Sequence, residues 1–254
     1  MSVTGERTYA VTTAALMILA ALIIGYSKTA LGGLAVLSVA IFADLLPAKE
    51  STAAILVLLL VGDVIACWHY RRDADWGMVR RLMPAVLVGI VLGTVFLRIV
   101  DDTVLKRSIA VVILVLVALQ LYLKRRAVPV ASAAHQHPAA AWAAGAGAGF
   151  TTMTANAAGA VMTLYLSASG IDKRRFVGTN AWFFLIVNLA KLPFSIGLGL
   201  LHWRDVGRAG LLAPVILLGT WIGYWSIKRM SQGTFDVAVL LASAVAGVGL
   251  LVRS

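Results

Sequence analysis

The stretch "GYSKTALGGLAVLSVA", residues Gly25 to Ala40, places one lysine and a Gly-Gly pair inside an otherwise apolar run. That run extends from Tyr9 to Leu46, which is far too long for one crossing, because a transmembrane helix needs about 20 apolar residues. The parts on either side of "YSKTALGG" are each somewhat short for a full span. We therefore predict two half-helices that meet inside the membrane at this break.

The whole chain has the composition of an integral membrane protein. Of its 254 residues, 61% are hydrophobic and 13% are charged, whereas an average soluble domain carries about a quarter charged residues. Eight apolar segments stand between clusters of charge, at residues 9–46, 52–70, 79–99, 104–123, 141–168, 176–201, 208–228 and 234–252. Nothing of soluble-domain size remains outside them, so we predict a single all-α membrane domain over residues 1–254.

The segments form two groups of four around the basic, Pro- and Ala-rich stretch "LKRRAVPVASAAHQHPAAA". Within these groups, "MPAVLVGIVLGTVFLR" and "APVILLGTWIGYWSIK" share the pattern P-x4-G-x3-G-x4-[RK]. The matching positions, each 130 residues apart (214 − 84), are Pro84, Gly89, Gly93 and Arg98 against Pro214, Gly219, Gly223 and Lys228. We predict a first repeat at 9–123, a connecting loop at 124–140 and a second repeat at 141–252.

The paired glycines have the small-x3-small spacing that lets two membrane helices approach closely. We interpret Gly89, Gly93, Gly219 and Gly223 as packing residues. Their partner is either the other half of the chain or another helix of the same half.

The first segment of the second half, "AAGAGAGFTTMTANAAGAVMTLYL", is also interrupted by small and polar residues, between Gly149 and Gly159. Discontinuous helices in corresponding positions of two repeats indicate a transporter binding site. Helix N-termini at such breaks offer free N–H groups and partial positive charge, so with Lys28 they would bind an anion. The predicted substrate-binding residues are Lys28, Thr29, Gly32, Gly33, Thr152, Thr154, Asn156 and Gly159.

Three further polar residues stand within apolar segments: Asp63, Asn188 and Lys191. An ionisable group at the centre of a span costs about 2.5 to 3.5 kcal/mol on insertion scales, which makes it a functional candidate. Lys28 and Lys191 could instead extend their ammonium groups to the membrane interface. Asp63 could neutralise a lysine, cap a kink or carry a coupling proton, and the sequence leaves these roles open.

Two topologies fit the segments. If each first segment is one crossing, the halves are parallel, and if it is a hairpin that returns to its starting side, they are inverted. In the inverted layout, the loops around 71–81, 124–137, 173–175 and 228–229 share one side with 12 basic residues against 8 on the other. Basic loops favour the cytoplasm, so we predict inverted halves with both termini outside it.

Several function classes are not expected. The net charge of +11 sits in loops that flank apolar spans, where anionic lipid headgroups attract it, so we expect no nucleic-acid binding. No hydrolase, zinc-protease or P-loop pattern is present, and we expect no catalytic residue, metal or cofactor. We predict a transporter rather than an enzyme. The alternative is a membrane-embedded enzyme or assembly subunit that uses the same cavity.

The motifs "GYSKTALGG", "LLPAKESTAA", "WHYRRDADW" and "GFTTMTANAAGAVMTLYL", in this order, resemble the sulfite exporter TauE/SafE family, which is related to toluene sulfonate uptake permeases. The resemblance implies a secondary transporter, with export as the expected direction, that moves sulfite, thiosulfate or organosulfonates across the bacterial inner membrane by alternating access. By position, the family's glycine-rich motifs fall on Gly25, Lys28, Gly32 and Gly33, and on Gly149, Asn156 and Gly159. Membrane lipid, a coupling proton or sodium ion, and assembly into an oligomer are compatible with this layout.

Overall fold

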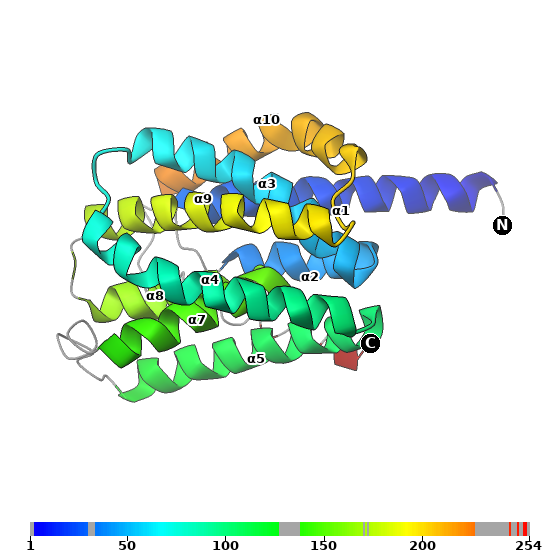
Figure 1. Cartoon of the computed structure of the whole chain (residues 1–254). Coiled ribbons are helices and arrows are strands. Elements are labelled where there is room, and N and C mark those ends of the chain that lie inside the picture. Colours follow the sequence, from blue (N-terminus) through cyan, green and yellow to red (C-terminus); the bar gives the residue numbers. More distant parts are fainter. Residues whose placement is uncertain are drawn as a thin grey trace.

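The computed structural model describes residues 3–29, 34–126, 138–169, 171, 173–226, 244, 248 and 251–252. The helices are α1 (Val3–Thr29), α2 (Ala35–Leu45), α3 (Ala48–His69), α4 (Trp76–Ile99), α5 (Asp102–Arg126), α7 (Pro138–Ala155), α8 (Ala158–Ala168), α9 (Lys173–Gly197) and α10 (Trp203–Ser226) (Figure 1). The described residues include no strand, which confirms the all-α prediction. The predicted segment at 234–252 lies almost wholly outside the described residues.

Five of the described helices, α1, α3, α4, α9 and α10, are long and apolar enough to cross a membrane. Their outward faces carry exposed apolar side chains, among them Leu87, Val91 and Leu92 on α4 and Leu217 and Trp221 on α10. Apolar surface of this extent is expected where side chains meet lipid rather than water. The prediction of a multi-pass membrane protein is therefore confirmed.

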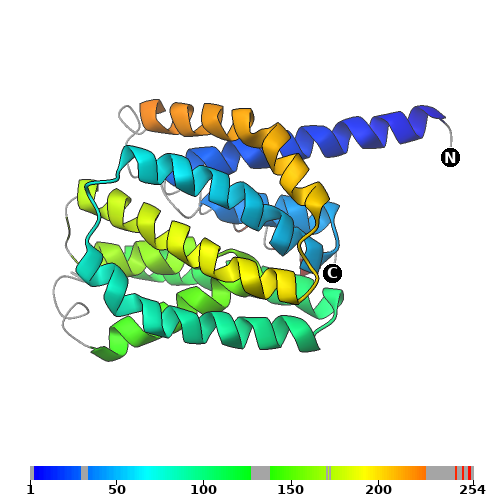
Figure 2. The same ribbon diagram turned by 45° about the horizontal axis from the view of Figure 1, so that its top comes forward.

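The first segment is interrupted where predicted, and its two parts fold back on each other. The first part is not a half-helix, however, because α1 has 27 residues and is long and apolar enough to cross a membrane. The helices α1 and α2 run in opposite directions (Figures 1 and 2), and Ser38 on α2 donates a hydrogen bond to the Ala20 carbonyl on α1 at 2.9 Å. The helix α1 continues to Thr29, so Lys28 lies in its last turn. The break itself falls between α1 and α2, and Gly32 and Gly33 lie outside the described residues.

The second break lies at Asn156 and Ala157, inside the predicted interval. Asn156 has a left-handed backbone with φ of 48°, and its N–H donates to the Thr152 carbonyl at 3.1 Å. This is the arrangement of a helix that ends in a left-handed residue, for which asparagine is tolerated. The helix α8 then runs back alongside α7 (Figure 1).

The paired glycines pack each half of the chain against the other half. A Cβ atom on Gly89 of α4 would overlap the Ala146 carbonyl oxygen of α7, and a Cβ atom on Gly219 of α10 would overlap the Leu22 carbonyl oxygen of α1. The question that the sequence left open is thereby answered, because α4 pairs with α7 and α10 pairs with α1. Absence of side chains at these positions allows the backbones to touch.

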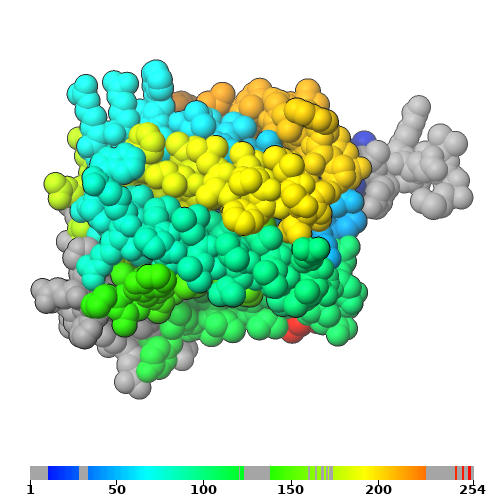
Figure 3. All heavy atoms as spheres, viewed as in Figure 1, coloured from blue at the N-terminus to red at the C-terminus, as the bar shows by residue number. Residues whose placement is uncertain are grey.

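The ends of the bundle are tied by polar contacts between distant parts of the chain. At one end, Arg174 Nε lies 3.0 Å from Asp73 Oδ1, and the Asp75 N–H donates to Thr179 Oγ1 at 2.9 Å. At the other end, Arg204 contacts Glu50 at 2.5 Å. Between these ends, α9 and α4 lie side by side and their side chains form a continuous surface (Figure 3).

Candidate functional site

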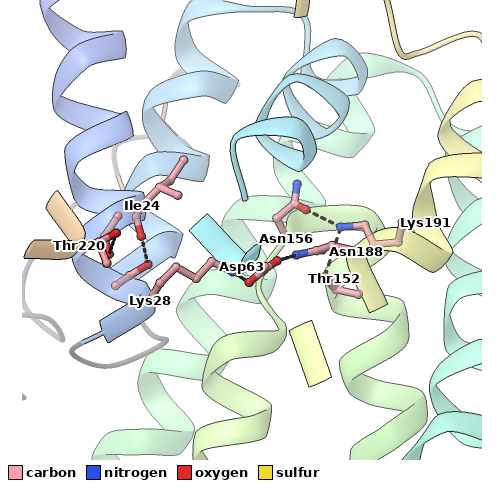
Figure 4. Close-up of polar contacts among 10 residues, drawn as sticks. Ile24, Lys28, Asp63, Thr152, Asn156, Asn188, Lys191 and Thr220 are labelled. Carbon is pink, nitrogen blue, oxygen red and sulfur yellow. Dashed lines mark hydrogen bonds and ion pairs between the residues drawn. The ribbon is translucent and has the colours of Figure 1, made fainter. Parts of the chain in front are cut away.

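A buried ion pair joins the first break to the middle of α3. Lys28 Nζ contacts Asp63 Oδ1, and their side chains are 9% and 0% exposed. The other carboxylate oxygen, Oδ2, accepts a hydrogen bond from Asn188 Nδ2 on α9 at 2.6 Å (Figure 4). Lys28 Nζ also lies 4.9 Å from the centre of the Phe184 ring, a favourable cation–π arrangement. Asp63 therefore neutralises Lys28 in this conformation.

A second group of contacts joins α9 to the second break. Lys191 Nζ donates to Asn156 Oδ1 at 2.5 Å and to Thr152 Oγ1 at 3.3 Å (Figure 4). Asn156 Nδ2 donates to the Thr52 carbonyl of α3 at 3.1 Å. Because Lys191 is only 2% exposed, its ammonium group does not reach a membrane interface. It extends inward and holds the second break in place.

The two groups leave an unequal balance of charge inside the protein. If all three groups are ionised, the ammonium groups of Lys28 and Lys191 face a single carboxylate, Asp63. Among the described residues, only neutral side chains accept hydrogen bonds from Lys191. A buried charge is costly unless it is paired. When all three groups are ionised, the described part of the site therefore carries one unbalanced positive charge.

A small cavity lies where the two breaks approach each other. Its volume is about 20 Å³, and it is lined by Ser27, Lys28, Ala35, Leu59, Thr152, Asn156, Gly159, Asn180, Phe184 and Asn188. A cavity of this size holds about one water molecule. The cavity as the structure has it therefore admits nothing larger than water, and the surrounding helices would have to move apart to admit a larger solute.

Most of the predicted site residues that the structure describes lie at this cavity. Lys28, Thr152, Asn156, Gly159 and Asn188 line it. Asp63 contacts Lys28 and Asn188 directly, whereas Lys191 lies behind Asn156 and Thr152.

Four predicted site residues contribute no described group to the cavity. The Thr154 hydroxyl donates to the Phe150 carbonyl one turn earlier in α7, and Thr154 is absent from the cavity lining. The side chain of Thr29 lies outside the description, as do Gly32 and Gly33.

Sequence reasoning missed two cavity residues on α9, Asn180 and Phe184. Their spacing carried a signal, because Asn180, Phe184 and Asn188 recur every four residues and so share one face of a helix. The sequence analysis did not single out this face because most of the segment is apolar.

The described residues contain no group of three or more His, Cys, Asp or Glu side chains that could hold a metal ion. They do bring two interrupted helices, a buried lysine and a buried aspartate together at one cavity. Interrupted helices around a polar site at membrane depth are the arrangement of membrane transporters.

Comparison with known families shows to which family of membrane transporters the chain belongs. The family model described as sulfite exporter TauE/SafE matches residues 17–250. The chain therefore belongs to the sulfite exporter TauE/SafE family, as the order of its motifs indicated. Neither the curated proteins nor the solved structures compared with the chain include a match.

Proposed function

We propose that this protein is a secondary transporter that exports a small sulfur-containing anion, of the sulfite, thiosulfate or organosulfonate class, by alternating access. The observation that carries the proposal is the Lys28 ammonium group, which lines a cavity between two helix breaks and is only 9% exposed. A fixed positive charge at that depth compensates the cost of moving an anion away from water. The bacterial inner membrane, implied by the family resemblance, is the proposed location.

We further propose that the two halves are inverted repeats, which is the layout that alternating access uses in many transporters. The packing of the helices supports this. A Cβ atom on Gly25 would overlap the Ile216 carbonyl oxygen, and a Cβ atom on Gly149 would overlap the Val86 carbonyl oxygen. The first helix of each broken segment thus packs against a helix of the other half: α1 packs against α10, and α7 packs against α4. Figure 1 supports opposite orientation, since α1 and α7 start from opposite ends of the bundle.

The ion pair suggests how anion binding is linked to a proton. An anion that approaches Lys28 is repelled by the negative charge of Asp63, which is already paired with the Lys28 ammonium group. Protonation of Asp63 removes this repulsion and frees Lys28. The groups that face Asp63 are Lys28 from α1 and Asn188 from α9, with Lys191 acting at longer range and Cys67 one turn along α3. We therefore expect anion and proton to bind together, with a proton favoured over sodium as the coupling ion.

Flux of sulfite, thiosulfate, sulfoacetate and sulfate into proteoliposomes tests the function. The purified protein alone should move at least one sulfur anion without changing it chemically, whereas a membrane-embedded enzyme would alter the substrate. Lys28→Met should reduce anion binding and flux by at least about tenfold, because the charge that compensates desolvation is lost. Lys49→Met, which changes a lysine outside the cavity, should retain both activities. A well-folded Lys28→Met protein with wild-type anion affinity would contradict the proposed site.

A further inference from the structure

The cavity contains acceptor oxygens for which the described residues supply no donor. Asn188 is 0% exposed, its Nδ2 donates to Asp63, and its Oδ1 has no hydrogen-bond partner in the described part of the protein. Asn180 Oδ1, two turns earlier on the same face of α9, is buried and also has no partner there. A buried acceptor without a donor costs about 1 to 3 kcal/mol. A ligand that supplies a donor would recover this free energy.

The orientation of the Asn188 amide is fixed by its neighbour. If the amide were turned over, Asn188 Oδ1 would face Asp63 Oδ2, and two acceptors would oppose each other, both with Asp63 ionised and with its proton on Oδ1, the oxygen that faces Lys28. The Nδ2 group therefore stays on Asp63, and Oδ1 is the atom left for a ligand. Since Asn188 and Asn180 both line the cavity, the ligand must present a hydrogen-bond donor to this wall.

The same cavity disfavours a cationic ligand. Lys28 already lines it, and Lys191 lies behind Asn156 and Thr152. Once Asp63 is protonated, as the proposed coupling requires, Lys28 is the ammonium group that lines the cavity, and one negative charge balances it. The ligand that satisfies both conditions therefore has a single negative charge and at least one donor hydrogen.

We propose that the cavity selects a protonated oxyanion, namely hydrogensulfite in preference to the sulfite dianion, with Asn188 and Asn180 as the residues that recognise its O–H group. This inference rests on the proposed function, because it specifies the substrate of the same site. The oxygens that carry the negative charge face Lys28, and the O–H group donates to an asparagine oxygen. The asparagines then reject anions of equal charge that lack a donor.

Methanesulfinate provides the test, because it has a methyl group where hydrogensulfite has a hydroxyl group and carries the same single charge. Binding of both anions to the purified full chain is measured by calorimetry at one mildly acidic pH. A single pH keeps Lys28, Asp63 and Lys191 in the same protonation states for both ligands. The wild type should bind hydrogensulfite at least about tenfold more tightly than methanesulfinate, since a site built around a hydroxyl rejects the analogue without it.

Two variants test whether the asparagines cause the preference for hydrogensulfite over methanesulfinate. In Asn180→Leu, hydrogensulfite affinity should fall while methanesulfinate affinity does not, so that the ratio approaches one. Asn188→Leu should do the same, although it also removes a partner of Asp63. Leu189→Ala, on an exposed position of the same helix, is the control and should keep the wild-type ratio.

The possible results separate the inference from the function on which it rests. Equal affinities for the two anions in the wild type would overturn the inference, and so would an unchanged ratio in a folded Asn180→Leu protein, although transport would stand. A folded wild type that neither binds nor moves any sulfur anion would instead overturn the proposed function. If neither leucine variant folds, the ratio of hydrogensulfite affinity to methanesulfinate affinity in the wild type decides whether the inference stands.

Discussion

At the scale of single residues, Asn156 combines two tasks that few other residue types could perform together. Its backbone ends α7 with φ of 48°, and its side chain joins Lys191 to the Thr52 carbonyl. Glycine would accept the backbone conformation but would make neither side-chain bond. Leucine would make neither bond and would be strained there, at a cost of about 1 to 3 kcal/mol.

This difference predicts distinct effects for two substitutions of Asn156. Asn156→Gly keeps the backbone conformation but removes the acceptor of the buried Lys191 ammonium group and the bond to Thr52, so it should lower both the unfolding temperature and the anion affinity. Asn156→Leu should lower the unfolding temperature further, because it adds backbone strain. Thermal unfolding in detergent and anion titration measure the two properties. An Asn156→Gly protein with wild-type affinity would limit this residue to packing.

Asp63 determines the predicted dependence of transport on pH. In the wild type, flux should increase as the pH falls, because protonation of Asp63 releases Lys28 for the anion. Asp63→Asn removes the proton-binding group, so flux of methanesulfinate, which keeps its single charge across this pH range, should vary much less with pH. Asp44→Asn, a partly exposed aspartate outside the cavity, is the control and should keep the wild-type profile. An unchanged pH profile in Asp63→Asn would leave Asp63 as a structural partner of Lys28.

At the scale of elements, the contact between α4 and α7 depends on glycines that let two backbones touch. A Cβ atom on Gly149 would overlap the Val86 carbonyl oxygen, whereas a Cβ atom on Gly147, two residues earlier on α7, would meet nothing within 4 Å. Both glycines lie within α7 and have the same intrinsic helix propensity, but only Gly149 faces the backbone of a neighbouring helix. They therefore form a matched pair for measuring the value of this contact.

We predict that Gly149→Ala destabilises the protein by about 1 to 3 kcal/mol, because an added methyl group in a close-packed contact forces the helices apart. Gly147→Ala should be neutral or slightly stabilising, since alanine favours a helix over glycine. Denaturant unfolding in detergent gives both values. Equal stabilities for the two variants would show that α4 and α7 do not approach as closely as described.

At the scale of the whole molecule, the basic loops predict the orientation in the membrane. The loops at 71–81 and 173–175 lie at the same end of the bundle (Figure 1), and this end belongs to the side with 12 basic residues against 8. The positive-inside rule then places this end in the cytoplasm. The opposite end, which includes the connection between α9 and α10, would face outward.

Labelling of single cysteines in whole cells tests this orientation. In a Cys67→Ser background, Leu201→Cys should react with a membrane-impermeant maleimide in intact cells. Ala74→Cys, in the connection between α3 and α4, should react only after the membrane is permeabilised. The reverse pattern would invert the proposed orientation and would place both termini in the cytoplasm.

The sequence by itself determined the class of protein, the all-helical fold and the places of both breaks. Hydrophobic length and Gly-rich interruptions are properties of short stretches, which can be read without knowing how helices cross. Only the tertiary structure decided which polar residues meet. Asp63 and Asn188 are 125 residues apart, and Lys191 and Asn156 are 35 apart. Pairing over such distances depends on how the helices rotate and cross. The inward direction of Lys191 and the place of Asn180 in the cavity are therefore set by the packing of α3, α7 and α9, which the sequence does not specify locally.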